Sequence, residues 1–162
     1  MAEEMDMSAE KECCPRFDPA PWQERWVTLD GKTFVKDRVR SFLRIPLNFG
    51  AVMKRNMAKI QQAEAVTPQM LLLSDENSLW GADVYIEVAR EVPGAAMASI
   101  EGTFLAQAYE GSFRDIPKWI EDMRRRVANK GKTLRKLLFY YTTCPVCAKK
   151  YGHNYVVLFA QV

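Results

Sequence analysis

The order of predicted strands and helices is the same in both halves of this 162-residue chain, and this order restricts the possible folds. Apolar residues at strand or helix spacing predict strand, helix, strand, strand in the first half, over 33–45, 48–63, 69–73 and 80–89. The second half repeats the order over 98–110, 115–131, 134–142 and 155–162, without a residue-by-residue repeat. We therefore expect an α+β fold in which two strand-helix-strand-strand modules form one antiparallel sheet, with both helices on one face and a ligand groove on the other.

The two predicted helices have a capping residue at the start and one apolar stripe. Asn48 can cap the first helix, and Asp115 can cap the second. Apolar residues recur at helical spacing in both, at Phe49, Val52, Met53, Met57 and Ile60, and at Ile116, Trp119, Ile120, Met123 and Val127. Each stripe predicts a helix that packs on the sheet.

Composition sets the domain boundaries that we expect. Residues 1–20 are polar and acidic and lead into prolines, which is typical of an irregular N-terminal arm. With 48% hydrophobic residues, the remainder can bury one substantial core. We expect a single domain over residues 21–162, with module one at about 30–92 and module two at about 96–162.

Charge and hydropathy argue against membrane and nucleic-acid partners. The longest apolar runs are too short to cross a bilayer and the N-terminus is acidic, so we expect a cytoplasmic protein. The formal charge is +3, and basic residues gather at 124–126 and 130–136, where a helix is predicted to end. Cations there complement the helix dipole, although a phosphate-binding patch is the alternative.

The segment from Trp80 to Val88 has the pattern most suggestive of function. Strand periodicity puts Asp83, Tyr85 and Glu87 on one face and three apolar residues on the other. A carboxylate and a phenol beside a tryptophan suit a cleft for a lipophilic cation or an electrophilic drug, although an ordinary half-buried strand alternates in the same way.

The segment 104–113, FLAQAYEGSF, is a predicted strand that ends in a glycine before the second helix, and that helix contains Trp119. In these features the chain resembles the GyrI-like small-molecule-binding family. The blocks CCPRF at 13–17, RIPLNFG at 44–50, LSDENSLW at 73–80 and YYTTCP at 140–145 resemble a stand-alone bacterial branch often labelled hydrolase. No helix-turn-helix extension accompanies them, which disfavours a transcription regulator.

This resemblance implies an aromatic cleft that holds a glutamate. In the family's drug sensors the acid lies on the last strand of the second module, but the strand at 155–160 has no acid here. By the symmetry of the two modules, the corresponding acid in this chain is Glu87 on the last strand of the first module. We expect Glu87 to act as a base that activates water. The alternative is that Glu87 pairs with Arg40 or Arg44 on a neighbouring strand.

Other predicted site residues are aromatic or basic. Tyr85 and Tyr140 are the expected catalytic partners of Glu87, hydrogen-bonding a developing oxyanion. The predicted ligand-binding residues are Phe42, Arg44, Trp80, Phe104, Tyr109 and Tyr141. Aromatic residues in strands are also common in ordinary cores, so core packing is the alternative for each.

Cysteines form the other conspicuous motif. Cys144 and Cys147 make a CxxC that could chelate zinc or cycle as a dithiol, with Cys13, Cys14 or His153 as further ligands. Because no second spaced CxxC is present, we expect reduced thiols, no metal and no cofactor. The only histidine is His153, which disfavours a Ser-His-Asp mechanism.

Two functions compete on this evidence. The first, implied by the resemblance, is a hydrolase that detoxifies hydrophobic cyclopropane-bearing electrophiles in an aromatic groove. The second is non-catalytic binding, sensing or sequestration of lipophilic drugs, including cationic ones. The family name alone also implies an inhibitor of a DNA-handling enzyme such as gyrase. In the first two, the partner is a hydrophobic small molecule.

Overall fold

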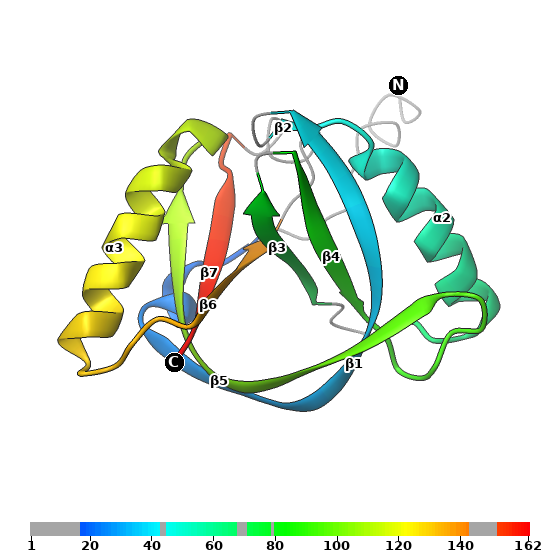
Figure 1. Cartoon of the computed structure of the whole chain (residues 1–162), viewed down its shortest axis with the longest axis horizontal. Helices are drawn as coiled ribbons and strands as arrows, with labels where there is room; N and C mark the ends of the chain where they lie inside the picture. Colours follow the sequence, from blue (N-terminus) through cyan, green and yellow to red (C-terminus); the bar gives the residue numbers. More distant parts are fainter. Residues whose placement is uncertain (1–16, 43–44, 68–70, 79, 143–151) are drawn as a thin grey trace, which may run out of the picture.

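The computed structural model describes residues 17–42, 45–67, 71–78, 80–142 and 152–162 (Figure 1). Its strands are β1 (Arg25–Phe42), β2 (Ile45–Pro46), β3 (Leu72–Ser78), β4 (Gly81–Glu87), β5 (Ala96–Glu110), β6 (Lys136–Tyr141) and β7 (Tyr155–Gln161). The α-helices are α2 (Phe49–Gln62) and α3 (Ile116–Asn129), and two short 3-10 helices are η1 (Ala20–Trp22) and η2 (Phe113–Asp115). None of the helices in this described part is long and apolar enough to span a membrane.

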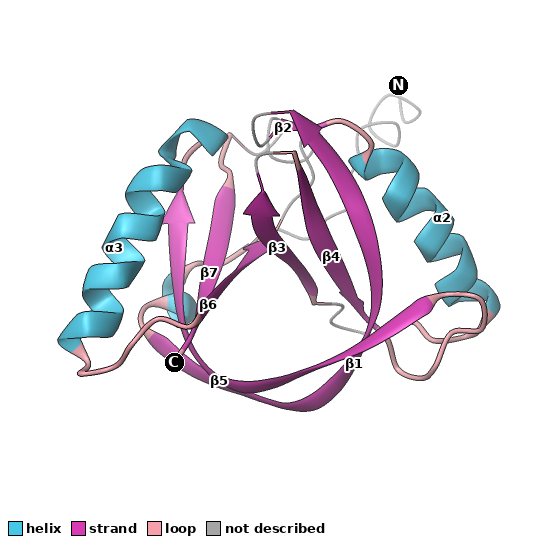
Figure 2. Cartoon of the chain, viewed as in Figure 1, coloured by secondary structure: helices cyan, strands magenta, loops and turns pink. Residues whose placement is uncertain are grey.

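Six strands close into a ring. The neighbours follow the order β1, β4, β3, β6, β7, β5, and β5 pairs again with β1, so that every strand of the ring has a partner on both sides. All of these pairings are antiparallel. The short β2 pairs with the end of β1, and Figure 2 shows the ring with its two helices outside. Closure leaves no long edge exposed within the ring.

The predicted fold class is therefore wrong. We expected an open antiparallel sheet with both helices on one face and a groove on the other, but the structure is a closed six-stranded antiparallel barrel. The helices lie on opposite outer sides of this barrel, α3 on the left and α2 on the right of Figure 1. What would have been the free face of an open sheet is the interior of the barrel.

Two long, bent strands explain the closure. β1 has 18 residues and β5 has 15, so each is long enough to pair with two neighbours along its length. The pairing of β1 with β5 shifts register between Leu29 and Lys32, where Gly31 has a φ of 67°. Such bulges bend a strand and increase its twist, which carries β1 around the barrel.

Two strands are longer than the sequence pattern predicts, because contacts with neighbouring strands override the local signals for a turn. The expected strand at 33–45 begins instead at Arg25, because the Asp30-Gly31 pair, typical of a turn, is absorbed as a bulge. The polar residues 74–78, which lie between the strands expected at 69–73 and 80–89, belong to β3. Ser74 there is only 4% exposed, and Asp75 forms an ion pair with Lys136 of β6. Tertiary contacts thus hold polar residues in a strand.

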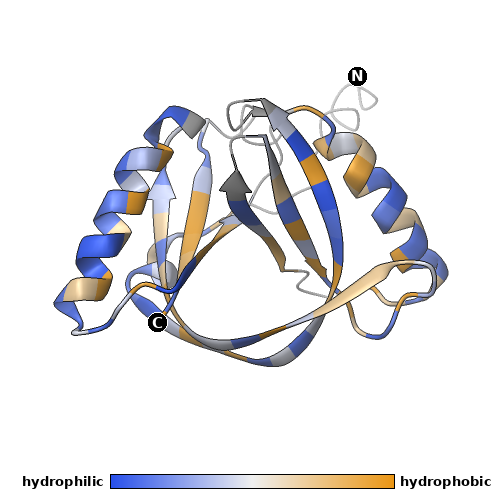
Figure 3. Cartoon of the chain, in the orientation of Figure 1, coloured by the Kyte–Doolittle hydropathy of each residue, from blue (hydrophilic) through white to orange (hydrophobic). Residues whose placement is uncertain are grey.

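Apolar residues form one core inside the barrel and others beneath the helices. The interior core includes Phe34, Leu73, Tyr85, Phe104 and Phe159. Alternate residues of the same strands face outward, where Val35, Val84 and Ile86 pack under α2 and Leu105, Phe139 and Leu158 pack under α3. Figure 3 shows this alternation as hydrophilic and hydrophobic bands along β1.

Aromatic side chains fill one part of the barrel interior. Trp22 of η1 lies 6.1 Å from Tyr140 and 5.7 Å from Phe159, measured between ring centroids. Phe17 lies 6.4 Å from both Trp22 and Tyr140. We call Phe17, Trp22, Tyr140 and Phe159 the aromatic cluster. Tilted and edge-on contacts at these distances add to the stability gained from burial.

Candidate functional site

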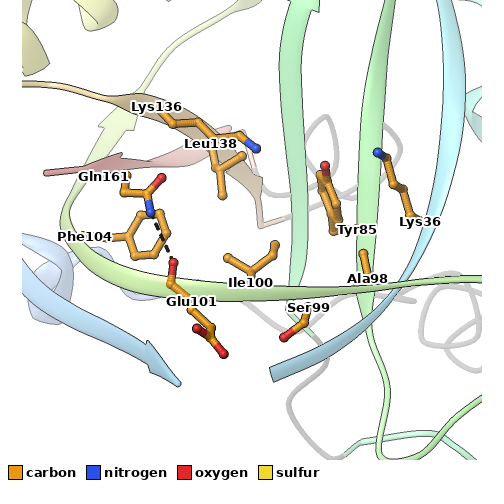
Figure 4. Close-up of a pocket in the computed structure, with 10 residues that line it drawn as sticks. All are labelled: Lys36, Tyr85, Ala98, Ser99, Ile100, Glu101, Phe104, Lys136, Leu138 and Gln161. Carbon is orange, nitrogen blue, oxygen red and sulfur yellow. Dashed lines mark hydrogen bonds between the residues drawn. The ribbon is translucent and has the colours of Figure 1, made fainter. Parts of the chain in front are cut away.

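A pocket of about 360 Å³ opens beside the aromatic cluster (Figure 4). Strands β1, β4, β5, β6 and β7 all contribute to it, through Lys36, Tyr85, Ala98, Ser99, Ile100, Glu101, Phe104, Lys136, Leu138 and Gln161. We call it the Tyr85 pocket. Its volume lies in the usual range for pockets that hold small organic molecules.

Tyr85 is the residue around which this pocket is built. The strand alternation predicted from sequence is confirmed for it, since Val84 and Ile86 pack under α2 while Tyr85 faces the interior. The residue is only 7% exposed. Among the residues that the structure describes, its hydroxyl has no hydrogen-bond partner, and yet it is not sealed from solvent. A nearly buried tyrosine with an unused hydroxyl at a pocket is available to a ligand.

Two lysine side chains flank Tyr85. The Nζ atom of Lys36 lies 5.7 Å from the centroid of the Tyr85 ring, and that of Lys136 lies 5.8 Å from it. Lys36 is the cross-strand partner of Tyr85 in the register of β1 with β4. In Figure 4 the two ammonium groups lie on either side of Tyr85 and close to its hydroxyl end. Both distances are within the range of cation–π contacts.

The two lysines differ in their carboxylate partners. Lys136 Nζ lies 3.3 Å from Asp75 Oδ2. No ion pair of Lys36 with a carboxylate occurs within the described ranges of the chain. The pocket therefore contains one ammonium group that is balanced by a neighbouring acid and one that is not.

The remaining lining is apolar on one side and polar at the rim. Phe104, which is 1% exposed, and Leu138, also 1% exposed, form the wall together with Ile100. At the rim, Gln161 Nε2 donates a hydrogen bond of 3.2 Å to the main-chain oxygen of Glu101, drawn as a dashed line in Figure 4. Glycine at 102 permits this approach, because a Cβ atom there would lie 2.6 Å from Gln161 Nε2.

Glu87, the predicted base, lies on the same face of β4 as Tyr85 but is not among the residues that line the pocket. Its Oε1 accepts a hydrogen bond of 3.2 Å from Lys32 Nζ, and its Oε2 accepts one of 3.1 Å from the main-chain N–H of Leu71. The side chain is 13% exposed. The alternative interpretation, an ion pair with a cation of the neighbouring strand, is realised with Lys32 rather than with Arg40, and Arg44 lies outside the described residues.

The predicted aromatic partners are distributed over the molecule. Phe104 lines the pocket with Tyr85, and Tyr140 belongs to the aromatic cluster. Tyr141 donates a hydrogen bond to Glu76 and stacks on Phe139 under α3. Trp80 is 60% exposed.

Tyr109 faces the other way, toward α3. Its ring stacks on Trp119 at 5.6 Å, and its hydroxyl donates a hydrogen bond of 2.6 Å to Asp122 Oδ2. Burial and the neighbouring carboxylate raise the pKa of Tyr109 well above its usual range. Asp122 also binds Arg126, so Tyr109 is part of a network that ties α3 to β5.

Several predicted residues cannot be compared with the pocket in this way. The backbone of Phe42 lies at the end of β1, and Arg44 falls outside the described residues. Cys13, Cys14, Cys144 and Cys147 also fall outside them. His153 lies 2.8 Å from Glu110, measured from Nδ1 to Oε1. Within the described ranges, no group of three His, Cys, Asp or Glu residues is placed to hold a metal ion.

Sequence reasoning missed both lysines of the pocket. Lys136 was grouped with the basic run that follows α3, although its strand position places it over Tyr85. Lys36 lies on the same face of β1 as Arg38, which pairs with Asp83 at 3.2 Å. The alternation of that strand was the available signal, because Lys36 and Arg38 are two residues apart and therefore share a face.

Taken together, these groups suit a molecule with a hydrophobic body and an electron-rich end. The apolar wall can bury rings, while the Tyr85 hydroxyl and the ammonium group of Lys36 can donate hydrogen bonds to oxygen. Positive charge and a phenol in a partly enclosed site also stabilise negative charge that develops during a reaction.

Comparison with solved structures shows that this fold is shared. The chain is similar to a hydrolase from Listeria innocua, with 10% identity, a TM-score of 0.60, and coverage of 97% of this chain and 98% of the other. It is also similar to SAV2435, whose structure was solved bound to tetraphenylphosphonium, with 9% identity, a TM-score of 0.51, and coverage of 85% and 92%. At such identities the likeness concerns the fold alone.

Comparison with protein families is more specific. None of the curated proteins matches this sequence. The family model described as "Bacterial hydrolase", however, matches residues 5–162, which is nearly the whole chain. Because the match includes all the strands and helices of the barrel, the protein belongs to the bacterial hydrolase family.

Proposed function

We propose that this protein binds a hydrophobic small molecule in the Tyr85 pocket and opens a cyclopropane-bearing electrophile there by hydrolysis. The observation that carries the proposal is the unpaired hydroxyl of a nearly buried Tyr85, set between two ammonium groups. A hydrogen-bond donor in such a place has no structural task among the described residues, whereas a substrate oxygen would satisfy it.

The comparisons with known proteins support a hydrolase and a binder of small molecules, whereas the cyclopropane substrate is part of the proposal alone. The family carries the name hydrolase, and a neighbour with the same fold is described as a hydrolase. Another neighbour holds tetraphenylphosphonium, which indicates that this fold can accommodate a hydrophobic organic molecule.

The proposed reaction adds water across one strained bond. The water oxygen forms a bond to a cyclopropane carbon, one ring C–C bond breaks, and its electron pair moves into a conjugated carbonyl group. The water loses one proton, and the carbonyl oxygen gains one. The product is therefore a single ring-opened molecule that carries both an alcohol and an enol or phenol. Tyr85 would donate to the oxygen on which negative charge develops, with Lys36 and Lys136 nearby.

Glu87 stays the predicted acceptor of the proton from water, and Tyr140 the predicted second polar partner. Glu87 follows Tyr85 by two residues on the same face of β4, which places both on the barrel interior. Its carboxylate is engaged by Lys32, so action as a base requires water to enter beside that lysine. Glu87→Gln tests this role and should lower turnover by about 100-fold or more.

The decisive experiment compares two tyrosine variants. Protein is incubated with a neutral cyclopropane-bearing electrophile, and ring-opened product is measured by mass spectrometry. Tyr85→Phe should lower kcat by about 100-fold, since it removes the donor to the oxyanion and keeps the ring. Tyr109→Phe is the matched control, because its hydroxyl is bound to Asp122 on the outer face of the barrel. Equal turnover in wild type and Tyr85→Phe would reject Tyr85 as the catalytic donor.

Non-catalytic binding is the second candidate. The same pocket can hold a ligand without turnover, since the apolar wall and the polar rim suffice for affinity. Saturable binding of the electrophile with no product in the wild-type protein would establish sequestration and exclude the hydrolase.

A further inference from the structure

We propose that the Tyr85 pocket selects molecules in which an anionic group, such as a carboxylate, is attached to a hydrophobic ring system. This inference uses the pocket of the proposed function and names its ligand class. It differs from a preference for lipophilic cations, the class to which tetraphenylphosphonium belongs.

Two ammonium groups already lie near the ring of Tyr85. A cation that enters an aromatic pocket is attracted by the negative face of a ring. Here ammonium groups already lie within 5.7 Å and 5.8 Å of the Tyr85 centroid. A ligand cation would have to displace a lysine or lie beside two like charges, and both are unfavourable.

Lys36 differs from its neighbours at positions 32 and 38 on β1. Its ammonium group has no carboxylate partner within the described part of the chain, although neighbouring β1 residues do. Lys32 pairs with Glu87 at 3.2 Å, and Arg38 pairs with Asp83 at 3.2 Å. Of the three cations at positions 32, 36 and 38 on this face of β1, only the lysine at the pocket lacks a carboxylate partner among the described residues. A ligand carboxylate would supply the missing acid.

Three hydrogen-bond donors converge in the Tyr85 pocket. The Tyr85 hydroxyl and the ammonium groups of Lys36 and Lys136 all point into the same space in Figure 4. These groups can donate to oxygen, and two of them carry positive charge. Lys136 forms an ion pair with Asp75, but its ammonium group keeps further N–H donors that can bind a ligand.

The other acid of the pocket lies apart from these donors. Glu101 is at the rim and exposed, and its carboxylate points away from Tyr85 in Figure 4. It therefore does not fill the place of the ligand anion.

The apolar wall defines the other end of the ligand. Ile100, Phe104 and Leu138 line the pocket opposite the donors, and the volume of about 360 Å³ limits the occupant to a compact molecule. A fused aromatic ring against this wall, with its carboxylate toward Lys36, fits both parts of the pocket.

Three probes of one shape test the proposal by calorimetric titration of the full-length protein. Naphthoate carries the anion, naphthamide is its neutral counterpart, and naphthylmethylammonium carries a positive charge. Naphthoate should bind at least ten-fold more tightly than either of the others, and its affinity should fall as salt is raised. Equal affinities for the three probes, or tighter binding of the ammonium, would overturn the proposal.

Two lysine variants localise the effect. Lys36→Met should weaken naphthoate binding about ten-fold and leave naphthamide binding unchanged. Lys54→Met removes the same charge from an exposed position on α2 and should leave both affinities unchanged. An equal loss in the two variants would mean that only net charge matters, and the proposal would be wrong.

Failure of this inference can be told apart from failure of the proposed function. A preference for naphthoate that depends on Lys36, in a protein that never opens a cyclopropane, would support the ligand class and reject the hydrolase. Turnover of a neutral electrophile that naphthoate does not inhibit would support the hydrolase and reject the ligand class.

Discussion

The aromatic cluster and the Tyr85 pocket occupy neighbouring parts of one barrel interior, and they are built in opposite ways. In the cluster, Trp22 closes over Phe159 and Tyr140, so the space is filled by rings. In the pocket, Lys36 and Lys136 take the corresponding places around Tyr85, and an open volume of about 360 Å³ results. Ammonium groups retain hydration, so they resist the close packing that stabilises the cluster.

Phe104 joins the two regions. Its ring lines the pocket and lies 6.2 Å from the ring of Phe159. The packed region therefore holds one wall of the pocket in place. Stability and binding therefore depend on adjacent residues of the same core, and substitutions should separate the two properties.

The largest effect is expected from emptying the packed region. Phe159→Ala should lower the free energy of unfolding by about 4 kcal/mol, because it removes a ring that is 1% exposed and leaves a cavity. Ile100→Ala, at the pocket wall, should cost about 1 kcal/mol, since part of that side chain already faces open space. Denaturant unfolding monitored by fluorescence measures both. Equal losses would show that the two regions are packed alike.

Filling each region is the converse experiment. Ala106 is 0% exposed in the interior core, whereas Ala98, on the same strand, lines the pocket. Ala106→Phe should destabilise the protein by about 3 kcal/mol through overpacking, while Ala98→Phe should cost less than about 1 kcal/mol. The Ala98 variant should also lose naphthoate binding in calorimetry. Unchanged binding would place the ligand outside the Tyr85 pocket.

Charge within the pocket gives a smaller effect. Asp75 lies 3.3 Å from Lys136, so Asp75→Asn should free that ammonium group and tighten naphthoate binding by about three-fold. Glu91→Gln removes a charge from an exposed loop position and serves as the control. If both variants change the affinity equally, Lys136 does not contact the ligand.

The smallest effect concerns a paired charge on the outer side of β1. A hydrogen bond from Arg55 lowers the pKa of Asp37 to about 2 from its ordinary value of 3.8. The resulting stabilisation is present above pH 3.8 and is lost as pH falls toward 2. Arg55→Met should raise the pKa of Asp37 toward 3.8, as measured by NMR titration, with Lys54→Met as the unchanged control. An Asp37 pKa that stays near 2 would contradict this assignment.

The sequence predicted the helices well because the signals are local. The apolar stripes of α2 and α3, with Val52, Ile60 and Trp119 among them, are buried as predicted. Asn48 and Asp115 immediately precede the two helices, but neither side chain makes the predicted capping hydrogen bond. Strand faces were predictable for the same reason, as Tyr85 and its neighbours on β4 show. A period of two or of 3.6 is enough to say which side of an element is apolar.

Site prediction was weaker because contacts between strands select the site. Tyr85 and Phe104 were expected from sequence and do line the pocket, but Lys36 and Lys136 were not expected there. The residue types alone did not indicate that a lysine of β1 and a lysine of β6 would lie beside the same tyrosine. Glu87 was chosen by module symmetry, and its partner Lys32 lies on a part of β1 that was not predicted to be a strand.

Local patterns in the sequence are sufficient to place both helices and most of the strands approximately, and to say which face of each is apolar. Closure into a barrel depends on the tertiary structure, because β1 has to meet β5, from Arg25 opposite Ala106 to Lys36 opposite Ala96. Pairing of distant segments leaves no local pattern in either strand. That closure brings Lys36, Tyr85 and Lys136 into one pocket and so decides which molecules the protein can bind.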